Sequence, residues 1–254
     1  MKKLKPFSLK SLDFISDEKV DDKSVQGSEA WRIDKAGCFS GSNMRHLMSC
    51  NNKGKRMKWS VGDPEQIVAF GRPAEKYIYQ VGMERRTGIL SMEPKSRELE
   101  HGKTHEPLLV DKLVKDGVIS NVETVGFLRF PNYDNGGASV DRICDHSGVR
   151  VALEVKCPVS WDGHFNRMYD FVSEKHADFW QFQAETLAAK TDFLLYVVAH
   201  PMTVDEYTFQ IFEPSKLHQS QMLKRCFIAD KAISLWGEYT YSEALSIACK
   251  QFVL

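Results

Sequence analysis

The stretch ALEVKCPVS at residues 152–160 places an acid and a base two positions apart. In an extended strand, Glu154 and Lys156 share one face, because side chains alternate between the two faces. The other face of the same strand carries Val151, Leu153 and Val155 and is apolar. A carboxylate and an ammonium group in this position either form a solvated strand face or belong to a catalytic site.

A third charged residue supports the catalytic interpretation. The turn at 145–148 joins strands expected at about 137–144 and 150–157, and this hairpin places Asp141 opposite about residues 152–154. Two carboxylates that lie close together repel each other and favour a bound divalent cation, and oxygen ligands suit Mg²⁺ or Mn²⁺. Such a cation lowers the pKa of a bound water and takes up charge on a phosphoryl oxygen. A nearby Lys156 could orient that water or help to deprotonate it.

The acid-x-lysine spacing alone is a weak signal. It occurs three more times, as Asp17/Lys19, Asp21/Lys23 and Glu93/Lys95. A solvated strand face would explain any of these pairs. The pair at 154 and 156 differs because it lies on a strand with an apolar back, after a hairpin that carries an aspartate.

Two expected helices add polar residues to apolar faces. In the helix at about 96–116, Glu106 lies on the same face as Leu99, Gly102, Leu109 and Leu113. A buried carboxylate is costly unless it is paired or bound to a metal, and the alternative is a boundary glutamate that reaches solvent. In the helix at about 174–190, Gln181 lies among Ala177, Ala184 and Ala188, which a buried hydrogen bond would also explain. His101 and His105 lack an H-E-x-x-H context and favour a solvated helix face.

The pattern along the chain predicts one mixed α/β domain at 29–254 behind a polar arm at 1–28. We expect a short helix after residue 42, a basic loop at 51–56 and helical segments at about 65–86, 96–116 and 174–190. We expect strands at 122–130, 137–144, 150–157, 192–199 and 206–212, turns at 132–137 and 145–148, and one or two helices in the last forty residues. We find no internal repeat.

Composition excludes several classes of protein. The six cysteines form no C-x-x-C pair, which argues against a zinc ribbon or a thioredoxin-like site and fits a reduced cytoplasm. The basic N-terminus lacks the apolar run of a signal peptide, and no window approaches membrane-spanning length. The formal net charge is zero, so a nucleic-acid site would have to be a local patch.

Several short motifs occur together in one order. They are WRIDKAGCFSGS at 31–42, HGKTHE at 101–106, ASVD at 138–141, LEVKCP at 153–158, WQFQ at 180–183 and YVVAHP at 196–201. The set resembles the phage lambda exonuclease family, or YqaJ-like viral recombinases, within the PD-(D/E)xK nucleases. The resemblance implies a restriction-endonuclease-like α/β core, with a mixed central sheet flanked by helices.

The resemblance also implies roles for individual residues. Asp141, Glu154 and Glu106, with the backbone carbonyl of Val155, would bind two Mg²⁺ or Mn²⁺ ions, Lys156 would be the catalytic lysine, and Gln181 would lie beside the metals. The implied activity is 5′→3′ digestion of one strand of linear duplex DNA to mononucleotides, in recombination by single-strand annealing. The resemblance further implies a trimeric ring and a single-strand annealing protein as partner. It also implies that the protein acts in a bacterial cytoplasm and is encoded by a phage or prophage gene.

The segment at 31–42 is a candidate phosphate site. A serine-rich cap before a helix leaves free N–H groups that attract anions, and Lys35 adds a charge. By resemblance, Lys35, Ser42 and Ser139 would hold a terminal 5′-phosphate; a capped helix with a surface lysine is the alternative. The family favours arginine at position 35, and lysine lacks the two-pronged guanidinium, so we expect a weaker grip. Another departure, Val140 in place of proline, should change little.

The remaining candidates concern DNA contacts and rival functions. Lys53, Lys55, Arg56 and Lys58 are expected along the DNA path, since backbone contacts supply much of the affinity. One rival is an endonuclease of the same superfamily, although an iron–sulfur type would need four clustered cysteines and only Cys226 and Cys249 lie near the C-terminus. The other rival is a non-catalytic DNA-binding module, which the intact Asp141, Glu154 and Lys156 argue against.

Overall fold

The fold is that of a computed structural model, which describes residues 26–52, 55–56, 64–91 and 96–253. The first half contains α1 (Glu29–Lys35), β1 (Phe39–Ser40), the 3-10 turn η2 (Gly41–Asn43), α2 (Met44–Leu47), β2 (Asn51–Asn52), β3 (Lys55–Arg56), α3 (Pro64–Val68), α4 (Arg72–Thr87) and α5 (Arg97–Lys115). The second half contains β4 (Ser120–Glu123), β5 (Leu128–Phe130), β6 (Tyr133–Ala138), β7 (Arg142–His146), β8 (Val149–Lys156), α6 (Trp161–Met168), α7 (Phe179–Ala189), β9 (Leu194–Ala199), β10 (Tyr207–Phe212), α8 (Lys216–Leu235) and α9 (Tyr241–Val253). Among these residues, no helix is long and apolar enough to cross a membrane.

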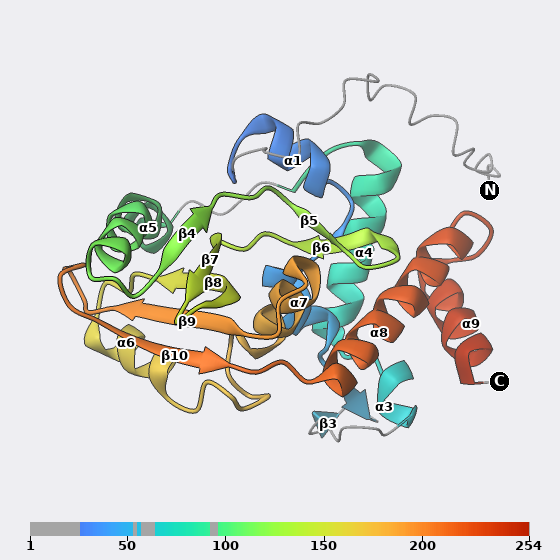
Figure 1. The fold of residues 1–254 in the computed structure, drawn as a ribbon. Helices are drawn as coiled ribbons and strands as arrows, with labels where there is room; N and C mark the ends of the chain where they lie inside the picture. The colour runs from blue at the N-terminus through green and yellow to red at the C-terminus, as the bar shows by residue number, and fades with distance from the viewer. Residues whose placement is uncertain (1–25, 53–54, 57–63, 92–95, 254) are drawn as a thin grey trace.

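The main sheet has β8 at its centre (Figure 1). Its strand order is β10-β9-β8-β7-β4, and β8 runs parallel to β9 and antiparallel to β7. The β7–β8 hairpin turns at Ser147 and Gly148, which both have positive φ, as a tight two-residue turn requires. Its register pairs Arg142 with Leu153, so Asp141 is the next residue beyond the ladder, opposite Glu154.

Helices cover both faces of the sheet. Leu109 and Leu113 of α5 pack with Leu153 and Val155 of β8 in one buried cluster. On the other face, Ala152 joins a larger cluster with residues of α7, α4 and α8. The predicted alternation of β8 is therefore confirmed, but both of its faces are buried. The face that carries Glu154 is not a solvated strand face.

A second, three-stranded sheet has the order β1-β6-β5, with β1 parallel to β6. Two glycines of β6 allow close packing there. A Cβ on Gly137 would collide with the carbonyl oxygen of Leu128 in β5, and one on Gly136 would lie 2.8 Å from the ring of Tyr133. These glycines therefore serve a strand, although the sequence pattern predicts a turn at 132–137.

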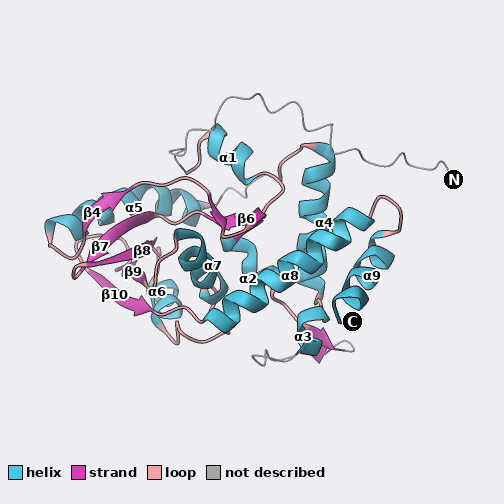
Figure 2. Ribbon diagram, turned by 45° about the vertical axis from the view of Figure 1, so that its right-hand side comes forward, coloured by secondary structure: helices cyan, strands magenta, loops and turns pink. Residues whose placement is uncertain are grey.

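Helices α4, α8 and α9 form the other end of the molecule. Figures 1 and 2 both show α4, α8 and α9 beside one another, away from the five-stranded sheet, with α7 between them and the strands. The guanidinium of Arg225 in α8 is fully buried there, and donates to the carbonyl oxygens of Leu47, Ser49 and Gln66. It ties α8 to the segment that follows the candidate phosphate site.

The mixed α/β fold class, with sheets flanked by helices, is confirmed, and most predicted elements exist. Two strand predictions are wrong. The expected strand at 122–130 is β4 and β5 in different sheets, and the expected strand at 137–144 is the end of β6 and the start of β7. The chain changes sheets between 138 and 142, which a two-residue alternation does not reveal. Neither α1 nor α6 is expected from the pattern.

Candidate active site

Glu154 and Lys156 lie at the end of β8 and form an ion pair. The Glu154 side chain is almost fully buried, whereas that of Lys156 keeps 21% of its surface exposed. Burial lowers the pKa of Lys156, but the carboxylates of Glu154 and Asp178 outweigh this effect and raise that pKa. The lysine therefore stands as a partly buried cation in contact with a buried carboxylate.

Asp141 lies where the hairpin register places it. Its Oδ2 accepts a hydrogen bond of 2.7 Å from the backbone N–H of Val155, and the residue is 7% exposed. Burial raises the pKa of Asp141 well above its usual value, and the charges of Glu154 and Glu106 add to the shift. The two strand carboxylates of the predicted cluster are thus close enough to act on each other.

Glu106 reaches the same region from α5. Its Oε1 lies 3.3 Å from Nη1 of Arg142, and its side chain keeps 26% of its surface exposed. Burial raises the pKa of Glu106; Arg142 opposes this shift and Glu154 adds to it. Of the predicted α5 stripe, Leu109 and Leu113 are buried, but Leu99 is 38% exposed, since the stripe leaves the sheet at its N-terminal end.

Gln181 bridges two acidic residues. Its Nε2 donates to Oε1 of Glu154 at 2.7 Å and to Oε1 of Glu185 at 2.6 Å. Glu185 is 1% exposed and follows Gln181 by one helical turn. The sequence interpretation names Gln181 but misses Glu185. The i, i+4 spacing of Gln181 and Glu185 on one helix is the signal that could have identified it.

A second pair of charges lies behind Lys156. Arg167 of α6 forms an ion pair with Asp178, whose Oδ2 also accepts a hydrogen bond of 3.2 Å from the hydroxyl of Tyr196. Burial raises the pKa of Asp178, but Lys156 and Arg167 outweigh it and hold that pKa below its usual value. Sequence interpretation missed this pair, because α6 was not expected.

The donor set suits a hard divalent cation. Asp141, Glu154 and Glu106 supply carboxylate oxygens, and repulsion among them contributes to the raised pKa values of Asp141 and Glu106. Within the described part of the chain, however, no three acidic, histidine or cysteine side chains converge as a ready coordination sphere. Each acid instead has a partner within the protein: Val155, Lys156 or Arg142. The residues fit a metal by chemistry, because each of these contacts uses one oxygen of a carboxylate that has two.

Two of the three candidate phosphate residues, Ser139 and Lys35, contact Trp31. The indole Nε1 donates to Oγ of Ser139 at 2.7 Å, and Nζ of Lys35 lies 4.5 Å from the ring centroid. Trp31 therefore joins two predicted phosphate residues that are far apart in the sequence. Ser42 is exposed on η2, and the backbone of the preceding Gly41 packs against Ala138, the neighbour of Ser139.

The prediction that a serine caps a helix at the candidate phosphate site is wrong. Ser42 lies within η2, which the four-residue α2 follows, and Ser40 makes no side-chain cap bond. So short a helix has almost no dipole, because the dipole grows with the number of aligned peptide groups. Any grip on an anion must come from Lys35, from hydroxyl groups and from local N–H groups.

A family model described as the YqaJ-like viral recombinase domain matches residues 31–190, which is more than half of the chain. The chain belongs to this family.

The fold of the chain is similar to the crystal structure of LHK-Exo in complex with dAMP, with a TM-score of 0.65 and 17% identity over 87% of this chain and 100% of that one. The alkaline exonuclease LHK-Exo from Laribacter hongkongensis appears again at 16% identity, with the same coverage and TM-score. A phage-related exonuclease from Haemophilus somnus 129PT is similar at a TM-score of 0.53 and 9% identity, over 85% of this chain and 95% of that one. No curated protein matches the sequence.

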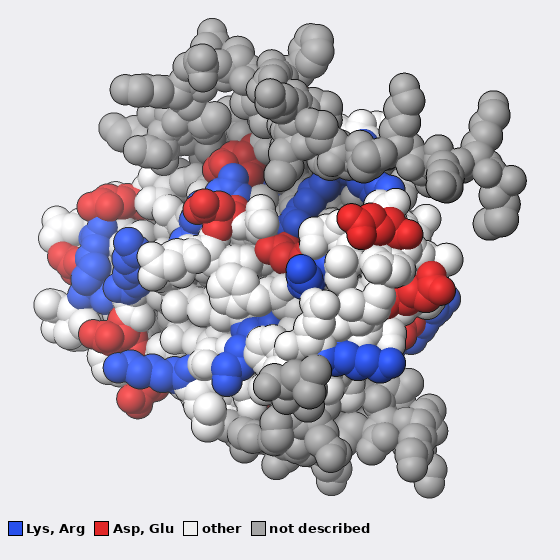
Figure 3. Space-filling model, turned by 90° about the vertical axis from the view of Figure 1, so that its right-hand side faces the viewer, with Lys and Arg blue, Asp and Glu red and all other residues white. Residues whose placement is uncertain are grey.

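The predicted DNA-binding residues of this YqaJ-like chain stay predictions. Lys53 and Lys58 lie outside the described residues, and the backbone of Lys55 and Arg56 forms β3, which pairs with β2. On the described surface over α8 and α9, Figure 3 shows acidic and basic side chains interspersed.

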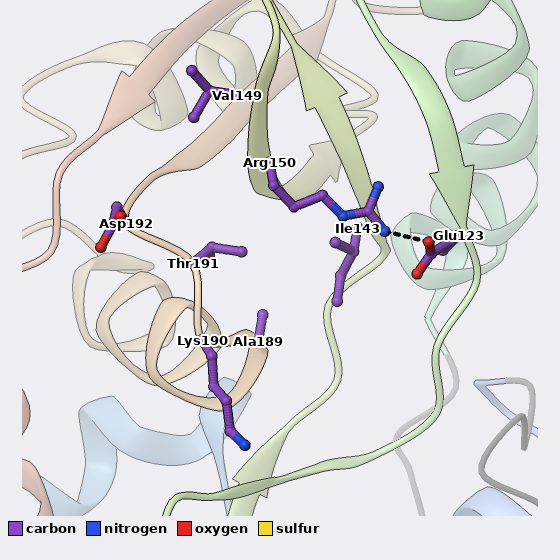
Figure 4. A pocket seen from close by; sticks show the side chains of 8 residues that line it. All are labelled: Glu123, Ile143, Val149, Arg150, Ala189, Lys190, Thr191 and Asp192. Carbon is purple, nitrogen blue, oxygen red and sulfur yellow. Dashed lines mark ion pairs between the residues drawn. The ribbon is translucent and has the colours of Figure 1, made fainter.

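A cavity on this YqaJ-like fold lies at the opposite end of β8 (Figure 4). Its lining includes Val149, Arg150, Lys190 and Thr191, and Arg150 forms an ion pair of 2.6 Å with Glu123. Four residues of strand, roughly 13 Å, separate Arg150 from residue 154. This cavity is therefore distinct from the candidate active site.

Proposed function

We propose that this chain is a divalent-metal-dependent nuclease that digests one strand of linear duplex DNA from its 5′ end and releases mononucleotides. The observation that carries the proposal is the cluster of Asp141, Glu154, Lys156 and Gln181 at the end of β8. Membership of the YqaJ-like family and a fold shared with exonucleases support it. The dAMP bound to LHK-Exo fits a mononucleotide product.

The residues divide the work by their chemistry. Asp141, Glu154, Glu106 and the backbone carbonyl of Val155 would hold Mg²⁺ or Mn²⁺, two ions by family resemblance. When bound, the metal supplies Lewis-acid stabilisation of the phosphoryl oxygens. Lys156, a partly buried cation beside Glu154, would orient the attacking water and offset charge on the phosphate as it becomes five-coordinate.

The 5′ end would be recognised around Trp31. We propose that Lys35 attracts the terminal phosphate and that Ser42 and Ser139 donate hydroxyl bonds to it. The indole N–H of Trp31 occupies one lone pair of the Ser139 oxygen at 2.7 Å, which leaves the hydroxyl hydrogen to donate to a phosphate. Lysine gives a point charge rather than a bidentate grip, so the preference for a 5′-phosphate should be moderate.

The biological setting follows from the family. We propose that the enzyme acts in phage-type recombination in a bacterial cytoplasm, together with a single-strand annealing protein. A ring of three subunits that encloses DNA is part of this proposal. Lys53, Lys55 and Arg56 would contact the DNA backbone.

The test compares end-labelled linear duplexes, with and without a 5′-phosphate, with a closed circular plasmid, in Mg²⁺ and in EDTA. We expect mononucleotides from the 5′ ends of linear DNA only, and none in EDTA. Cutting of the circle would instead indicate an endonuclease. DNA binding without product from any substrate would leave a non-catalytic module.

Trp31→Phe should weaken the selection of 5′-phosphorylated ends. Phenylalanine keeps the ring beneath Lys35 but cannot donate to Ser139, so the hydroxyl loses its fixed orientation. We expect the rate ratio between phosphorylated and unphosphorylated ends to fall about 3- to 10-fold, the value of one neutral hydrogen bond of about 1 kcal/mol. Initial rates on the two substrates measure this ratio. An unchanged ratio would remove Ser139 from the phosphate site.

A further inference from the structure

Glu185 is a buried acid that the proposed division of roles does not use. It is 1% exposed in the middle of α7, and only one of its oxygens has a hydrogen-bond partner. The other oxygen, Oε2, is buried and meets no hydrogen-bond partner among the described residues. A carboxyl group that loses water for a single hydrogen bond costs free energy. The buried position of Glu185 is therefore better explained by its hydrogen bond with Gln181 than by a contribution to stability.

The two hydrogen bonds of Gln181 fix how its amide faces. Both N–H hydrogens of Nε2 are used, at 2.7 Å to Glu154 and at 2.6 Å to Glu185. Both partners are carboxyl oxygens that accept, and the nitrogen rather than the oxygen of the amide faces them. The carbonyl Oε1 then lies on the other edge of the planar amide. It remains an acceptor beside Glu154.

We propose that Glu185 is a positioning residue, which locks the Gln181 amide so that its nitrogen holds Glu154 and its carbonyl oxygen accepts a hydrogen bond from the attacking water. The inference rests on the proposed nuclease function. With Glu154 as sole partner, Gln181 could rotate about its side-chain bonds and present either atom. The second hydrogen bond removes that freedom before substrate arrives.

The environment of Glu185 agrees with this role. Burial raises the pKa of Glu185 well above its usual value, and the charge of Glu154 raises it further. A neutral carboxyl group still accepts the N–H bond through its carbonyl oxygen. A glutamine at 185 would offer the same acceptor at the same length, whereas a methionine would fill the volume without a comparable acceptor.

The test measures kcat and KM for nucleotide release from linear, 5′-phosphorylated duplex DNA in Mg²⁺. We expect Glu185→Met to lower kcat about 10- to 100-fold with KM nearly unchanged, and Glu185→Gln to stay within about threefold of wild type. Gln181→Ala should lose as much as Glu185→Met. The double variant should lose no more than either, since both changes remove one function.

Thr186→Val is the matched control. Thr186 is equally buried on the same helix, but its hydroxyl donates to the carbonyl oxygen of Phe182 and not to the site. This variant should change the melting temperature without changing kcat. If Glu185 had a merely structural role, the loss of kcat in Glu185→Met would instead follow the fraction of that variant that is unfolded.

Three results would overturn the inference while the nuclease function stands: wild-type kcat in Glu185→Met, an equal loss in Glu185→Gln, or losses in the double variant that multiply. Absence of any Mg²⁺-dependent product from the wild type would overturn the nuclease proposal and this inference with it. The two failures are therefore distinguishable.

Discussion

Lys156→Ala is expected to lower the rate of nucleotide release from linear duplex DNA by about 10³-fold, within the usual range for losing a positioned acid–base group. Its ammonium group contacts Glu154 at the end of β8, and its side chain is only partly exposed. Removing it takes away the positive charge beside Glu154 and leaves that carboxylate the hydrogen bond from Gln181. Single-turnover rates under saturating Mg²⁺ measure the effect.

Two further variants separate the catalytic role of Lys156 from general charge effects. Lys175→Ala removes an exposed lysine on the loop before α7, and should leave the rate within about twofold of wild type, as surface substitutions usually do. Lys156→Arg keeps the charge but spreads it over a planar group, and should restore only part of the activity. A Lys156→Ala enzyme with wild-type kcat would contradict the assignment.

Asp141→Asn is expected to abolish nuclease activity and, at the same time, to stabilise the metal-free protein at pH 8. Burial, Glu154 and Glu106 all raise the pKa of Asp141. Asparagine removes the charge but can still accept the N–H bond from Val155 through its Oδ1. We expect the melting temperature in EDTA to rise by at least about 2 °C, since about 1 kcal/mol corresponds to roughly 2–4 °C in a chain of this size.

The pH dependence has a definite sign. Because the folded pKa of Asp141 is raised, the folded state binds its proton more tightly than the unfolded state does. That contribution to stability is complete below the unfolded pKa, and is lost as pH rises through the folded value. The melting temperature of Asp141→Asn in EDTA should therefore exceed that of the wild type only slightly near pH 4, and by more towards pH 8. Thermal melts at each pH measure this difference.

Mg²⁺ and a second aspartate provide the controls. Mg²⁺ should raise the melting temperature of the wild type, because a cation relieves the repulsion, and should raise that of Asp141→Asn much less. Asp145→Asn, in the same hairpin, should change the stability of the metal-free protein in the opposite direction. A hydrogen bond from Asn121 lowers the pKa of Asp145, so losing its charge should slightly destabilise the protein at pH 8. A less stable Asp141→Asn at pH 8 would contradict the model of buried, repelling acids.

Much of the site was accessible from the sequence because its residues lie close together on regular elements. The alternation of 151–156 puts Glu154 and Lys156 on one face, and the short turn at 147–148 places Asp141 opposite them. Helical spacing placed Glu106 on a partly buried face and Gln181 on a packed one. Such relations follow from local geometry, with periods of 2.0 and 3.6 residues, and need no knowledge of distant contacts.

Long-range packing decided the rest. No local pattern shows that Gly136 and Gly137 lie in a strand, because the need for glycine comes from Tyr133 and from the carbonyl oxygen of Leu128. The hydrogen bond between Trp31 and Ser139 spans 108 residues. Residue types and spacing identify the side chains that could do the chemistry and those that share a face. Which of them are buried together depends on long-range packing, because desolvation and charge repulsion depend on everything packed around a group.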